Sequence, residues 1–200
     1  ATVLAVVCQL VPFLNLPFGG GFTIASMLPI VLVSYMYGIG WGLGAAFTYA
    51  VVQMLLGAST VTAFFMPSDD NYAGSIGAAI GICLIDYVLA YTVLGLGGVF
   101  RKMKSKTAAI VLGVVLALSL RYIAHIISGY IFFGAWADWF FKQEGFYAIG
   151  NTILDTFSGK ALSLVYAVFY NGLYMIPEII ITAIVAIPVS RIPAVRRADV

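Results

Sequence analysis

Charged residues are scarce in this sequence of 200 residues. Lys, Arg, Asp and Glu make up 9% of the chain, whereas hydrophobic residues make up 62% and the mean hydropathy is +1.06. A soluble domain is about 25% charged and about 45–50% apolar, so this composition excludes a chain that folds around one core in water. We expect lipid to cover the excess apolar surface, as in an integral membrane protein.

Residues that carry metal or redox chemistry are also rare. The chain has one histidine, His125, and two cysteines, Cys8 and Cys83. Both cysteines lie in apolar runs, where buried reduced thiols are typical, so neither a metal site nor a disulfide is predicted. The sequence has no G-x-x-x-x-G-K-S/T phosphate loop, no H-E-x-x-H zinc motif and no nucleophile motif. These absences argue against an enzyme and against ATP hydrolysis by this chain. The net charge of +2 gives no reason to expect nucleic acid as a partner.

Apolar runs, separated by glycine, proline and charged residues, divide the chain into membrane spans. Each span needs about 20 residues, so this length accommodates about six. The stretch 57–75 is predicted as an exposed loop, and the polar stretch 137–160 contains enough aromatic residues to be partly ordered at the membrane interface. We predict an all-α membrane protein, with a single domain over residues 1–200 that is a bundle of six transmembrane helices. The spans cover roughly residues 1–13, 22–37, 41–56, 75–100, 107–136 and 161–189.

The distribution of cations predicts how these spans are oriented. Four Lys or Arg residues lie in the 101–106 loop and three follow the last span, whereas the loops at 57–75 and 137–160 contain two between them. Cytoplasmic loops are enriched in Lys and Arg. We therefore predict that both termini of this multi-pass protein are cytoplasmic.

Ionisable side chains inside the predicted spans are costly and by default mark functional sites. Asp86 lies near the middle of the fourth span, where a carboxylate needs a cation, a hydrogen-bond donor or a proton. Two interpretations stay open: Asp86 pairs with Arg121 and joins two helices, or it faces a cavity and receives a polar or cationic ligand group. His125 lies one turn after Arg121 on the same helix face. It is either a satisfied core histidine or a ligand contact.

The last span carries polar and aromatic residues at neighbouring positions. Tyr166 and Tyr170 lie one turn apart, and Asn171 is adjacent to them. Aromatic residues at the end of a span often form only an interfacial belt, but an asparagine amide in a dry setting needs partners, which favours a pocket. Glu178 follows Pro177, which frees backbone groups, and either packs helices or contacts a ligand.

Four segments of the chain resemble one family in sequence and in order. They match the thiamine-specific substrate-binding (S) components of energy-coupling factor (ECF) transporters, which are bacterial vitamin importers. The segments are residues 23–30 (TIASMLPI), 85–91 (IDYVLAY) followed by 95–98 (GLGG), 121–134 (RYIAHIISGYIFFG) and 166–178 (YAVFYNGLYMIPE).

The resemblance implies a six-helix bundle that holds thiamine near the extracellular side of a bacterial cell membrane. It implies that Asp86 contacts the aminopyrimidine, and that Trp136, or Trp139, stacks on the ligand. Phe22 takes the place of a tryptophan that family members often carry in the first loop. Thiamine is then a transported ligand and not a cofactor. The remaining expected ligand contacts are Tyr87, His125, Tyr166, Tyr170 and Asn171.

The resemblance also implies partners. Ala1 and Ala5 form a small-xxx-small pair, which permits close helix approach. In the family this first-helix motif docks the chain on a transmembrane energising subunit, which works with two ABC-type ATPases. Packing within the chain explains the same spacing.

Three alternatives stay open at this stage. The chain is an S component for another vitamin or for hydroxymethylpyrimidine, which would keep the Asp86–His125 half of the site. It is a proton-coupled permease with Asp86, His125 and Glu178 as a relay. Or it is a structural membrane protein that binds no ligand.

Overall fold

The computed structural model describes residues 1–9, 12–15, 21–66 and 75–196, nearly all of them in helices. The described part of the first loop adds two short antiparallel strands, β1 (Pro12–Asn15) and β2 (Gly21–Thr23). The predicted all-α class therefore holds for the bundle, with this small ribbon added to it.

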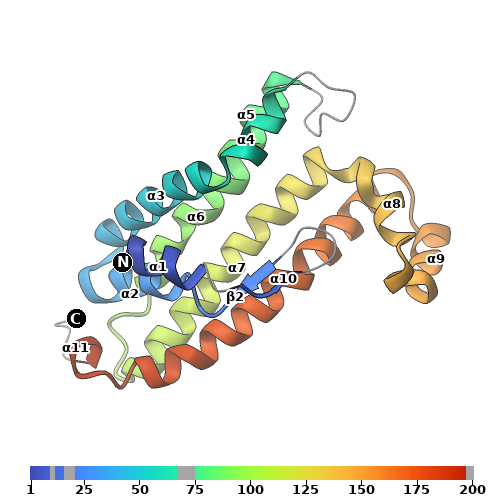
Figure 1. Cartoon of the computed structure of the whole chain (residues 1–200). Helices are drawn as coiled ribbons and strands as arrows, with labels where there is room; N and C mark the ends of the chain where they lie inside the picture. Colours follow the sequence, from blue (N-terminus) through green and yellow to red (C-terminus); the bar gives the residue numbers. More distant parts are fainter. Residues whose placement is uncertain (10–11, 16–20, 67–74, 197–200) are drawn as a thin grey trace.

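The helices form an elongated bundle in which α7 and α10 lie side by side along much of their length (Figure 1). Helix α11 lies at one end of the bundle, and α8 and α9 lie at the other. The helices are α1 (Thr2–Gln9), α2 (Leu28–Tyr37), α3 (Ile39–Leu56), α4 (Ala58–Phe65), α5 (Ile76–Ile82), the π-helix η1 (Cys83–Leu89), α6 (Ala90–Thr92), the 3₁₀-helix η2 (Val93–Gly98), α7 (Lys106–Phe132), the 3₁₀-helix η3 (Gly134–Trp136), α8 (Ala137–Phe141), the 3₁₀-helix η4 (Glu144–Phe146), α9 (Tyr147–Thr156), α10 (Gly159–Val189) and α11 (Pro193–Arg196).

Four helical stretches in the described part of the chain are long and apolar enough to cross a membrane. They are residues 39–56, 76–98, 106–132 and 159–189, and they coincide with the third to sixth predicted spans. The second predicted span corresponds to a shorter apolar helix, α2, which has 10 residues. The first corresponds to α1, which has 8 residues.

The prediction of an exposed loop over residues 57–75 is wrong in its first half. Residues 58–65 form α4, which follows α3 after a single residue, Gly57. The proline and polar residues that predicted a loop, residues 67–71, all follow this helix, whereas Phe64 within it is buried against Ala79 and Ile82 of α5. Residues 67–74 lie outside the described residues.

Close backbone packing holds the centre of the bundle together. A Cβ atom added to Gly113 of α7 would lie 2.0 Å from the carbonyl oxygen of Gly97, and one added to Gly95 would lie 2.5 Å from Cα of Leu43. No real Cβ makes contacts this short, so glycine is required at both positions. The main apolar core lies between α2, α3, η2, α7 and α10, and a second cluster fixes α8 and α9 to α10.

Candidate ligand-binding site

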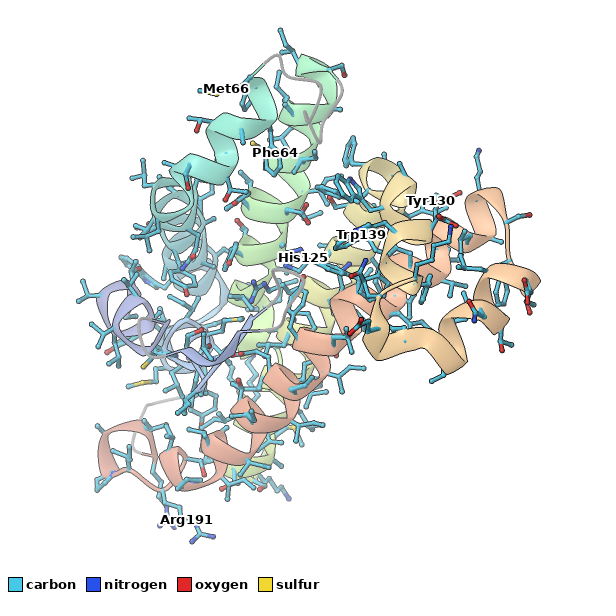
Figure 2. The ribbon with its side chains drawn as sticks, turned by 45° about the vertical axis from the view of Figure 1, so that its right-hand side comes forward. Phe64, Met66, His125, Tyr130, Trp139 and Arg191 are labelled. Atoms are coloured by element: carbon cyan, nitrogen blue, oxygen red, sulfur yellow. The ribbon has the colours of Figure 1, made fainter. Side chains whose placement is uncertain are left out.

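A cavity of about 780 Å³ opens among α4, the 76–98 helix, α7 and α10. Figure 2 shows His125 near the middle of the bundle and Phe64 of α4 above it. The side chains around the cavity are mostly aromatic or hydroxyl-bearing, with one carboxylate and one imidazole, and there is no Lys or Arg among the described residues that line it. They include Ser59, Thr60, Phe64, Asp86, Tyr87, Tyr91, His125, Tyr166, Tyr170, Asn171 and Tyr174.

Asp86 is held in place by two side chains of α7. Its Oδ1 lies 2.8 Å from Nδ1 of His125, and its Oδ2 accepts a 2.6 Å hydrogen bond from the hydroxyl of Ser128. The carboxylate side chain stays 19% exposed and lines the cavity. Of the two interpretations of Asp86, the geometry therefore agrees with a residue that faces a cavity, and its hydrogen-bond partner is His125 instead of Arg121.

His125 has one ring nitrogen engaged and one open. Because Nδ1 faces the Asp86 carboxylate, a hydrogen on that nitrogen leaves Nε2 as an acceptor. Nε2 is buried and has no hydrogen-bond partner among the described residues. Since a buried polar atom normally has a partner, and since His125 lines the cavity, this nitrogen is available to a ligand donor.

Asp86 and Tyr87 lie in the π-helical segment η1. A π-helix bonds each N–H five residues back and so places an extra residue in the turn. The two adjacent side chains and Tyr91, from the next turn, all line the same cavity. Such segments are rare and occur frequently at functional sites.

Tyrosines form two walls of the cavity. On α10, Tyr166 and Tyr170 have ring centroids 5.5 Å apart, and Tyr174 follows 6.3 Å from Tyr170. On the 76–98 helix, Tyr87 and Tyr91 stack with centroids 6.5 Å apart. The faces of aromatic rings carry negative potential and attract cations, so these walls suit a flat ligand with positive charge.

Asn171 joins α10 to α7 at the edge of this cavity. Its amide nitrogen donates to the carbonyl oxygens of His125, at 3.2 Å, and Ala167, at 2.9 Å. Its amide oxygen accepts from the Tyr174 hydroxyl at 2.5 Å. The amide that the sequence singled out therefore lines the cavity and also fixes the spacing of two helices.

The other predicted site residues lie elsewhere. Trp136 does not line the cavity; its ring meets Trp139 edge-on at 5.8 Å and packs against the second apolar cluster. The backbone of Phe22 pairs with Leu14 in the ribbon, and its side chain lies outside the described part of the structure. Ala5 is fully buried in the main core, whereas Ala1 is exposed.

A second, smaller cavity of about 90 Å³ lies next to the first, and Tyr91 and Tyr174 line both. Here Arg121 donates to the Tyr91 hydroxyl at 3.1 Å and lies over its ring at 4.3 Å. Glu178 accepts from the backbone nitrogen of Thr23 at 2.7 Å and from its hydroxyl. These buried charges face the base of the ribbon and do not line the larger cavity.

Sequence reasoning missed several cavity residues. Tyr91 and Tyr174 each lie four positions after a predicted site tyrosine, Tyr87 and Tyr170, and that spacing on one helix face was a usable signal. Ser59 and Thr60 had no such signal, because their segment was expected to be a loop.

Comparison with known proteins places the chain in a family. The sequence profile of the family described as thiamine transporter protein matches residues 1–68 and 73–141. The chain belongs to this family. It is 29% identical over 196 residues to the thiamine transporter ThiT of Bacillus subtilis (strain 168), a match that covers 92% of this chain and 83% of that protein.

The fold has a counterpart among solved structures. The structure of ThiT from Listeria monocytogenes superimposes with a TM-score of 0.61 and 18% identity, and covers 97% of this chain and 91% of that one. At this identity the likeness shows the fold. Together with the four long apolar helices, family membership makes the chain a multi-pass membrane protein of a transporter family.

Proposed function

We propose that this chain is the thiamine-binding S component of an ECF-type importer in a bacterial cell membrane. The observation that carries the proposal is the Asp86 carboxylate, which His125 and Ser128 hold in a cavity walled by tyrosines. Membership of the thiamine transporter protein family and the 29% identity to ThiT of Bacillus subtilis support thiamine as the ligand.

The two halves of thiamine match two kinds of group in the cavity. Its aminopyrimidine carries an amino group with two hydrogens to donate, which suits two acceptors, the Asp86 carboxylate and the open Nε2 of His125. Its thiazolium is a flat cation, which suits the faces of Tyr166 and Tyr170. The partly buried Asp86 carboxylate, with no Lys or Arg among the described residues that line the cavity, also offsets the positive charge of the ligand.

The proposal extends to topology and partners. We place both termini in the cytoplasm, with α1 and α2 completing six spans, because the cations gather in the 101–106 loop and after α10. Thiamine then enters from the extracellular side, and an energising subunit with two ATPases drives its release. Ala1 is exposed and available for docking, whereas Ala5 is covered by this chain's own core.

Titration of the purified chain tests the proposal. We expect thiamine to bind tightly with 1:1 stoichiometry and to change tryptophan fluorescence, because Trp136 and Trp139 lie beside the aromatic cluster that includes Tyr166. Isothermal titration measures the affinity independently of fluorescence. Pyridoxine and riboflavin serve as controls and should not bind. No heat and no fluorescence change with thiamine would overturn the proposal.

A further inference from the structure

Phe140 of α8 packs behind two residues that line the ligand cavity. Its side chain is fully buried, and it does not line the cavity. Its ring meets Tyr166 edge-on at 5.4 Å and Tyr170 edge-on at 5.6 Å, both with interplanar angles of 74°. One phenylalanine thus packs against two neighbouring tyrosines of the cavity wall.

We propose that Phe140 is a positioning residue for ligand binding, which fixes the rings of Tyr166 and Tyr170 in the orientation that the ligand needs. Edge-to-face aromatic pairs have a preferred geometry beyond simple burial, so two such contacts restrict the rotation of both tyrosines. A wall whose rings are already ordered loses less conformational entropy when a ligand binds. This inference rests on the proposed function, because it assumes that the ligand lies against these tyrosines.

The surroundings of Phe140 make it a firm support. Its neighbour Phe141 is also fully buried and packs against Phe146 and Phe169. A Cβ atom at Gly150 of α9 would lie 2.0 Å from the carbonyl oxygen of Phe141, so α8 and α9 are in backbone contact. Helices α8 and α9, between α7 and α10, therefore form a compact unit in which Phe140 packs against α10.

The two adjacent phenylalanines provide a matched experiment. Phe140→Leu keeps an apolar side chain but removes the ring that contacts Tyr166 and Tyr170. Phe141→Leu removes an equally buried ring of the same cluster, which contacts Phe140, Phe146 and Phe169 but neither of the two tyrosines. We expect Phe140→Leu to weaken thiamine binding about tenfold. Phe141→Leu should lower the melting temperature as much as Phe140→Leu does, but its affinity for thiamine should stay within about twofold of that of the original chain.

Phe140→Tyr restores an aromatic ring at the position, and we expect it to recover most of the affinity. Calorimetric titration with thiamine gives the affinities, and thermal unfolding in detergent gives the stabilities. If Phe140→Leu does not fold, Phe140→Met takes its place, because the flexible methionine side chain fills apolar gaps without a ring. Unchanged affinity in the ring-deleted variant, or an equal loss in Phe141→Leu, would overturn the inference. Absence of thiamine binding by the original chain would instead overturn the proposed function.

Discussion

At the scale of single residues, the site depends on a few polar atoms with defined partners. Asp86 uses one carboxylate oxygen for His125 and the other for Ser128, which is fully buried. These two contacts hold the carboxylate in one orientation. Because each oxygen has two lone pairs, each still has a free acceptor site. The carboxylate therefore remains able to accept a ligand donor.

Replacement of the Asp86 carboxylate should greatly lower the affinity for thiamine and leave the chain folded. We expect Asp86→Ala to weaken thiamine binding by about 100-fold or more, since hydrogen bonds to a charged group contribute about 1.5–3 kcal/mol each. Titration measures the loss, and circular dichroism with gel filtration checks the fold. Asp138→Ala is the control, because that carboxylate is exposed and forms a surface ion pair with Lys142 at 2.6 Å. Near-normal affinity of Asp86→Ala would assign Asp86 a packing role.

The sequence predicted which residues share a site more accurately than it predicted the hydrogen-bond and packing partners of each residue. Asp86, Tyr87, His125, Tyr166, Tyr170 and Asn171 all line one cavity, as the cost of polar groups inside the membrane suggested; their contact with a ligand stays a prediction. The sequence offered Arg121 as a partner of Asp86, but the structure has His125 there. The two lie one turn apart on the same face of α7, so the difference depends on the shift of two helices along their axes, which periodicity does not give. Trp136 was placed on the ligand by family resemblance, whereas in the structure it packs on Trp139.

At the scale of elements, local irregularities shape the cavity. The π-helix η1 carries Asp86 and Tyr87, and α4 covers the cavity with Ser59, Thr60 and Phe64. The hydropathy of residues 76–98 predicted one continuous helix, and it could not show a change in hydrogen-bond pattern inside that helix. The short α4 was missed because its stability comes from Phe64 packing on α5, a tertiary contact invisible in local sequence.

Two glycines in α-helices test the close packing between elements. Gly113→Ala puts a methyl group 2.0 Å from the carbonyl oxygen of Gly97, and backbone cannot rotate out of the way as a side chain can. Overpacking of this kind costs about 1–3 kcal/mol, so we expect a melting temperature several degrees lower in detergent. Gly44→Ala is the matched control. Open space surrounds Gly44 and alanine favours helix, so its melting temperature should not fall. Equal stability of the two variants would contradict the packing described for η2 and α7.

At the scale of the whole molecule, the two cavities separate the charged groups of the bundle. Asp86 and His125 line the larger one, whereas Arg121 and Glu178 line the smaller one beneath Tyr91 and Tyr174. Glu178 is engaged by Thr23 and Thr182. A proton relay from His125 to Glu178 would have to cross the two tyrosines, which weakens the interpretation as a proton-coupled permease.

Reconstitution of the chain alone distinguishes these mechanisms. We expect proteoliposomes containing only this chain to bind radiolabelled thiamine but not to accumulate it under an imposed pH gradient. Among the described residues, Asp86 and His125 line one cavity and Glu178 lines another. Filtration with and without the pH gradient separates binding from gradient-driven uptake, and excess unlabelled thiamine gives the non-specific background. Liposomes containing Asp86→Ala provide the baseline. Accumulation that a protonophore abolishes would favour the permease.

The contact between Gly113 and Gly97 also bears on how relatives of this chain can diverge. When a side chain blocks a new residue, a second substitution at the blocking position can make room, and the pair can drift together. Here the blocking atom is a main-chain oxygen, which every residue type carries. Gly113 therefore has no partner side chain whose replacement would make room for a larger residue, whereas a contact between two side chains outside the cavity, such as Phe141 with Phe169, can change through paired replacements.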